Sequence, residues 1–105
     1  MAMFLVELHR LGPLWDSSLP LEQQSNFPAH AAFMDGLVDE GFVVLGGPLV
    51  DEFRVIEAID AESVEAVRTT LARDPWNETH LQIEAITPWT IRLDSRQGGD
   101  AATHE

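Results

Sequence analysis

The chain has 105 residues, of which 45% are hydrophobic, and a formal net charge of −12 at pH 7. This length suits one domain with its own core, and the negative charge argues against binding to nucleic acid or to an anionic membrane surface. With no cysteine and no lysine in the chain, disulfides, thiolate catalysis and lysine Schiff bases are excluded.

The first half of the chain predicts a strand, a long loop and a helix. Apolar residues alternate in residues 3–11, as in a half-buried strand. Residues 14–27 are rich in polar residues and predict a loop, long enough to form a lid or a binding edge. A helix is expected over residues 28–40, because Pro28 fits a first turn and Gly41 fits a C-terminal cap.

The second half predicts a hairpin, a second helix and a last strand. Residues 42–45 and 53–59 are expected to pair around a turn at 50–52. Asp60 is a suitable N-cap for a helix over residues 61–72, which Pro75 ends. A strand follows over residues 80–86, which Pro88 ends or marks as an edge, and residues 89–93 are a candidate extension. The order βαββαβ predicts a ferredoxin-like α+β fold, an antiparallel sheet with two helices on one face.

The other face of the predicted sheet is expected to be mixed, with Glu7, His9, Gln82 and Glu84 beside Leu5 and Ile86. The chain also carries more apolar surface than two small helices cover, at Phe42, Val44, Trp76, Trp89 and Ile91. We therefore expect a homodimer in which sheet packs on sheet. Residues 1–94 are expected to form the domain and residues 95–105 a disordered acidic tail.

His30 is the main candidate for chemistry. Helical spacing places it on the apolar face with Phe33, Met34 and Leu37, where an imidazole needs a polar partner. Asp74 is the best candidate, because Asp39 falls on the opposite side of the helix. A carboxylate on one ring nitrogen would orient the histidine as a general base or acid. Two structural alternatives remain open: His30 as a satisfied core residue, and Asp74 as an Asx turn before Pro75.

The other candidate residues concern substrate binding and metals. Gly46 and Gly47 allow a ligand to approach the backbone closely, although a β-bulge or a strand end explains them equally well. Trp15 and Trp76 are candidate substrate contacts, but tryptophans more often pack in cores and interfaces. His9 and His80 lack the His-x-x-x-His spacing of helical zinc sites, so no metal is expected.

Several of these segments together resemble the YCII-related domain family, over about residues 3–93. The resemblance lies in Ala29-His30, Val38-Asp39-Glu40-Gly41, Gly46-Gly47-Pro48, Arg73-Asp74-Pro75-Trp76 and Pro88-Trp89. The family belongs to the dimeric α+β barrel group, with muconolactone isomerases and antibiotic-biosynthesis monooxygenases. It is marked by one histidine and one aspartate, which His30 and Asp74 match, and one related protein is a dehydrochlorinase of chlorinated hydroxyquinols.

The resemblance and the residues together predict a small cytoplasmic enzyme, an isomerase or lyase that needs no cofactor. His30 would act as general base or acid and Asp74 would orient it, in an isomerisation or elimination on a small organic molecule. The chain has no apolar run long enough to span a membrane and no basic start of a signal peptide, which favours the cytoplasm. The alternatives are a non-catalytic module that binds or senses a small ligand, and a protein in which the pair is only structural.

Overall fold

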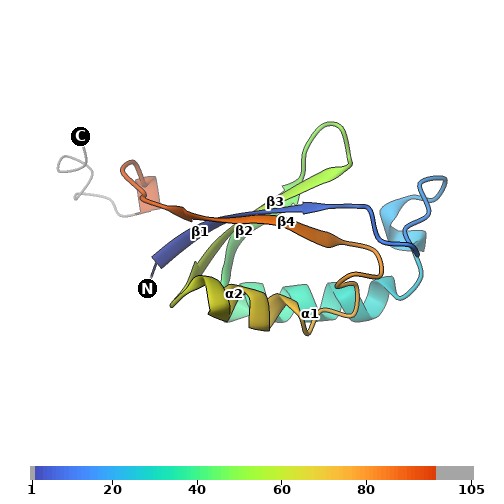
Figure 1. Cartoon of the computed structure of the whole chain (residues 1–105), viewed down its shortest axis with the longest axis horizontal. Helices are drawn as coiled ribbons and strands as arrows, with labels where there is room; N and C mark the ends of the chain where they lie inside the picture. Colours follow the sequence, from blue (N-terminus) through green and yellow to red (C-terminus); the bar gives the residue numbers. More distant parts are fainter. Residues whose placement is uncertain (1, 97–105) are drawn as a thin grey trace.

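The computed structural model describes residues 2–96 and contains one four-stranded antiparallel sheet with both helices on the same side (Figure 1). The strand order is β2-β3-β1-β4. The elements are β1 (Ala2–His9), the 3-10 helix η1 (Leu21–Gln23), α1 (Phe27–Asp39), β2 (Val43–Pro48), β3 (Arg54–Ala61), α2 (Val64–Leu71) and β4 (Gln82–Trp89). The predicted α+β class and the βαββαβ order are confirmed, and the arrangement is compatible with a ferredoxin-like fold.

The core lies between the sheet and the helices. Alternation along β1 directs Phe4, Val6 and Leu8 toward the helices, and all three are buried. Leu37 from α1 and Val67 from α2 belong to the same buried cluster. No helix in residues 2–96 is both long and apolar enough to cross a membrane.

Helix α1 ends as its sequence predicts. Gly41 has a φ of +79°, in the left-handed region that glycine adopts without strain. Its N–H donates to the carbonyl of Val38, and the N–H of Phe42 donates to the carbonyl of Leu37. This pair of bonds is a Schellman motif, which satisfies the last carbonyls of the helix and turns the chain into β2.

The predicted start of the second helix is wrong. Asp60 does not cap it, because β3 continues to Ala61 and pairs there with β1. The N-cap is Ser63, whose hydroxyl accepts a hydrogen bond from the N–H of Ala66, and α2 begins at Val64. The hydrogen bonds between strands outweigh the local preference of an aspartate for a cap.

The faces of β4 also differ from the simple alternation expected for residues 80–86. A bulge leaves Glu84 unpaired between Ile83, which pairs with Leu8, and Ala85, which pairs with Glu7. One extra residue reverses the side of everything beyond it. Ile86 therefore lies on the helix side, opposite Val6, and Ala85 takes its place on the open face.

Strand β4 also continues beyond the predicted end at residue 86. It runs through Pro88 to Trp89, and a proline is tolerated there because β4 is an edge strand.

One predicted strand is too short, and most of the predicted tail lies outside the described residues. The strand predicted over 42–45 runs on to Pro48, so Gly46 and Gly47 pair with β3 instead of following the strand. The predicted tail, residues 95–105, falls outside the described residues except for Ser95 and Arg96.

Candidate active site

The expected contact between His30 and Asp74 is confirmed. His30 lies in the first turn of α1, and Asp74 lies three residues beyond the end of α2. The Nδ1 atom of His30 is 2.8 Å and 3.0 Å from the two carboxylate oxygens of Asp74. Their side chains are 13% and 6% exposed. A carboxylate at Nδ1 holds the proton there, so that Nε2 carries the free lone pair of a neutral imidazole.

Asp74 has a second role, which is the structural alternative considered from the sequence. Its Oδ1 atom also accepts a hydrogen bond of 2.9 Å from the backbone N–H of Trp76, two residues on. This is an Asx turn across Pro75. The same carboxylate therefore shapes the chain after α2 and orients the histidine, so the two interpretations are compatible.

Trp76 lies between two imidazole rings. His30 stacks on one side at 4.0 Å between ring centroids and His80 on the other at 4.6 Å, with interplanar angles of 7° and 15°. The indole is 1% exposed, and its Nε1–H donates to the carbonyl of Ser25. The stack fixes the plane of the His30 ring, and the negative face of the indole favours positive charge on it.

His80 is suited to a passive role in this stack. Burial lowers its pKa, and the nearby His30 adds to this when it is charged. The neutral ring is 1% exposed, and its nitrogens lie 2.9 Å from the hydroxyls of Ser25 and Thr79. His80 therefore supports Trp76 from behind and presents no free nitrogen to a ligand.

His30 opens onto a cavity of about 440 Å³, here called the His30 cavity. Its other lining residues include Trp76 and both glycines predicted to contact a ligand, Gly46 and Gly47. Arg10 and Glu57 also line it, and all the remaining lining residues are apolar. The volume and the mostly apolar wall with few polar groups are typical of small-molecule sites.

Gly46 has a specific reason to be glycine. It pairs with Glu57 across the β2–β3 ladder, and both face the helix side. A Cβ atom at Gly46 would lie 2.9 Å from Cγ of Glu57 and 3.2 Å from the carbonyl oxygen of Ile56. The missing side chain therefore makes room for the Glu57 side chain within the cavity wall.

Glu57 is a site residue that was not anticipated from the sequence. It is 7% exposed, and its Oε1 atom is buried without a hydrogen-bond partner in residues 2–96. Burial, together with the smaller effect of the Asp74 charge, raises the pKa of Glu57 to about 7. One signal was present: Glu57 shares the buried face of β3 with Val55 and Ile59, where an acid is unexpected.

Trp15 and Arg10 lie at one end of this region. Trp15 does not line the His30 cavity, but packs edge-on against Trp76 at 5.8 Å. The guanidinium of Arg10 lies 4.6 Å above the Trp15 ring, and its NH1 donates to the carbonyl of Glu52 at 2.6 Å. Both residues therefore support the wall of the cavity and are themselves held by protein contacts.

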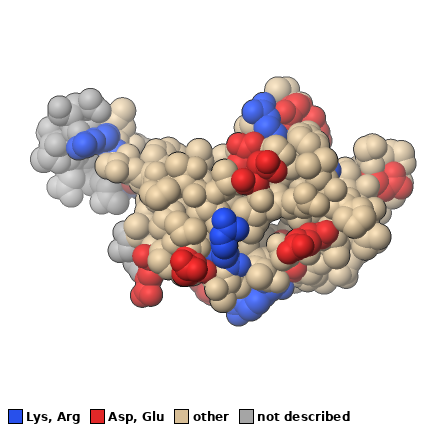
Figure 2. Space-filling view, viewed as in Figure 1, with Lys and Arg blue, Asp and Glu red and all other residues tan. Residues whose placement is uncertain are grey.

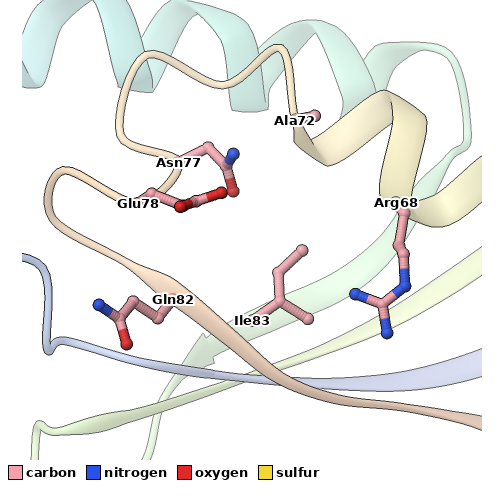
Figure 3. A pocket seen from close by; sticks show the side chains of 6 residues that line it. All are labelled: Arg68, Ala72, Asn77, Glu78, Gln82 and Ile83. Atoms are coloured by element: carbon pink, nitrogen blue, oxygen red, sulfur yellow. The ribbon is translucent and has the colours of Figure 1, made fainter.

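Other features of the described residues offer weaker sites. A polar hollow lies between the end of α2 and the start of β4, where Figure 3 shows Arg68 across from Asn77 and Glu78. It holds no buried ionisable group. No cluster of three or more metal-ligating side chains occurs in residues 2–96. On the face shown in Figure 2, basic side chains are interspersed with acidic ones.

The open face of the sheet contains a second histidine–carboxylate pair. Nε2 of His9 lies 2.6 Å from a carboxylate oxygen of Glu7, and the ring packs on Phe53. It does not line the His30 cavity.

Comparison with known proteins adds no relative. No protein-family model, no curated protein and no solved structure matches this chain. The resemblance to the YCII-related family therefore stays a prediction from the motifs.

Proposed function

We propose that this protein is a small cytoplasmic enzyme of the YCII-related type, in which His30 and Asp74 carry out general acid–base chemistry on a small organic molecule. One observation carries the proposal: a buried carboxylate holds Nδ1 of His30 at the wall of a cavity of about 440 Å³, and the ring makes no other hydrogen bond in residues 2–96. This leaves Nε2 available to a ligand.

The arrangement suits proton transfer. A neutral imidazole accepts a proton at Nε2 and becomes charged on both nitrogens, and the Asp74 carboxylate and the Trp76 ring both stabilise that charge. The proton can then be returned to a different atom of the substrate, which is an isomerisation. In an elimination, a leaving group departs after the proton is removed. Neither reaction requires a cofactor in principle.

The test is a comparison of two histidine variants. Wild type is incubated with unsaturated lactones, cyclic enones and chlorinated hydroxyquinols, and products and deuterium uptake are followed by proton NMR in D2O. His30→Gln is expected to lower the rate by about 100-fold or more, the usual contribution of a general base. His9→Gln is the matched control, because His9 also pairs with a carboxylate but lies on the other face. It is expected to retain the wild-type rate.

The same experiment separates the enzyme from the alternative, a module that binds a small ligand without reaction. Turnover that survives in His30→Gln would contradict the assigned role of His30. Ligands that bind to the wild type and are recovered unchanged across the whole set would favour the binding module and overturn the enzyme proposal.

We also propose that two copies pack through their open sheet faces. Exposed apolar side chains lie there, including Leu45, which is 68% exposed, and Trp89, which is 44% exposed. Leu5 and Ile56 belong to the same face by strand register. A second copy would remove this apolar surface from water.

Sedimentation at micromolar concentration is expected to give about twice the chain mass of 11.7 kDa. Trp89→Glu is expected to shift the protein to monomer, because a charge would be buried in the interface. Val50→Glu is the control, since Val50 is fully exposed at the β2–β3 turn and is expected to leave the dimer intact. A wild-type monomer would refute the sheet-on-sheet assembly.

A further inference from the structure

Glu57 is a buried carboxyl group that no described residue binds. Neither of its oxygens makes a hydrogen bond within residues 2–96, and Oε1 has no access to water. Two of the three residues with such unpartnered buried atoms, Arg10 and Glu57, line the His30 cavity. Buried polar groups are nearly always paired, so an unpaired carboxyl at a cavity wall calls for an explanation.

The surroundings of Glu57 keep it unpaired and in place. The β2–β3 and β1–β3 ladders fix its backbone between Gly46 and Val6. Gly46 gives its side chain room, and the neighbouring cavity wall is mostly apolar. A carboxyl group in such surroundings favours its neutral form, which has an O–H to donate. Because Oε1 is closed to water, a ligand in the cavity can supply an acceptor only to an O–H on Oε2, which also has no hydrogen-bond partner within residues 2–96.

We propose that the neutral Glu57 carboxyl donates a hydrogen bond to a carbonyl oxygen of the substrate while Nε2 of His30 removes a proton from the adjacent carbon. The substrates of the site are then small, largely apolar carbonyl compounds that can form enols. This inference rests on the proposed function, because it requires His30 as the base.

The proton and electron balance of the step is complete without another reactant. The C–H bond breaks, its proton goes to Nε2 of His30, and its electron pair forms the new C=C bond. The C=O π electrons move to oxygen, which takes the proton of Glu57. The enol, the imidazolium and the Glu57 carboxylate result. Return of the His30 proton to a different carbon of a conjugated enol, and of the hydroxyl proton to Glu57, completes an isomerisation.

The charges around the cavity favour a neutral substrate over a carboxylate. The chain carries a net charge of −12, and the Asp74 carboxylate lies beside His30. Arg10 is the cation that lines the cavity, and its charge is partly offset by the Glu52 carboxylate, 3.7 Å from NH1. An anionic ligand would therefore meet the acidic groups with only this already paired cation among the lining residues to offset them.

The probe for the donor role is 4-nitrophenol, whose oxygen imitates the enol oxygen and whose ionisation is visible by absorbance. Wild type is expected to bind it, and Glu57→Leu is expected to weaken binding on the order of tenfold, since the hydrogen bond from the carboxyl group to the phenol oxygen is lost. Glu57→Gln should weaken it less, because the amide N–H still donates. Glu62→Gln, at an exposed position, is the control and should bind as wild type.

Two further measurements separate this inference from the proposed function. His30→Gln is expected to keep phenol binding but to lose deuterium exchange into cyclohex-2-enone, because it lacks the base and not the donor. Glu57→Gln is expected to fold, by near-UV circular dichroism, and also to lose exchange, because an amide cannot supply a proton.

The outcomes are distinct. The inference is overturned if wild type and both Glu57 variants bind the phenol equally, or if wild type does not bind it at millimolar concentration. In either case, His30-dependent turnover of other compounds would leave the proposed function standing. Glu57-dependent phenol binding with exchange that survives in His30→Gln overturns the proposed function and the base role of His30, and leaves Glu57 a ligand-binding residue.

Discussion

Replacing Asp74 with alanine is expected to lower the free energy of unfolding by about 3–6 kcal/mol, because two buried hydrogen bonds to a carboxylate are lost, each of which contributes about 1.5–3 kcal/mol. The carboxylate is 6% exposed and accepts hydrogen bonds from Nδ1 of His30 and from the N–H of Trp76. Its loss leaves both donors unpaired and releases the turn after α2. Urea unfolding at pH 7 measures the change.

Asp39→Ala is the control for this measurement, because Asp39 is exposed at the end of α1 and is expected to change stability by less than about 1 kcal/mol. A double-mutant cycle with His30→Ala gives the coupling between the two side chains. An Asp74→Ala variant as stable as Asp39→Ala would show that the pair contributes nothing to folding, and that Asp74 is held for another reason.

The second large effect concerns pH. The pKa of Glu57 is raised from 4.5 to about 7 in the folded protein, so the folded state binds more protons than the unfolded state between these values. The contribution of Glu57 to the free energy of unfolding is therefore fully present below about pH 4.5, and it is lost as the pH rises through about 7. The loss amounts to about 3 kcal/mol.

Glu57→Gln is expected to abolish this decline, because an amide does not titrate. Glu62→Gln, exposed after β3, should keep the wild-type profile. The test compares the wild-type profile with the Glu57→Gln profile, because His80 also titrates in this range and with the opposite sign. Burial lowers the pKa of His80, so its contribution to stability is lost as the pH falls below 6.5. Parallel wild-type and Glu57→Gln profiles from pH 5 to 8 would show that Glu57 is ionised and solvated in the folded state.

Two residues of the proposed site, His30 and Asp74, could be predicted from the sequence, and a third, Glu57, could not. His30 could be found because helical periodicity places it on the buried face of α1, where an imidazole is conspicuous. Asp74 could be proposed because both helices were expected on one face of the sheet, and because the competing Asp39 falls on the opposite side of the helix. Glu57 was missed because its burial depends on residues distant in the chain: β1 and β2 pair on either side of it, and residues of α1 line the same cavity.

The amino-acid sequence by itself determined the element types and order, the inward face of β1, the end of α1 at Gly41 and the pairing of His30 with Asp74. The first three depend on residues close together in the chain. The pairing depends on a buried imidazole that needs a polar partner, for which Asp39 lies on the wrong side of the helix. Only the tertiary structure decided that β3 extends past Asp60, that a bulge at Glu84 reverses Ala85 and Ile86, and that Gly46 makes room for Glu57. Each of these depends on strand register, which sets the neighbours across the sheet and is a property of the assembled chain.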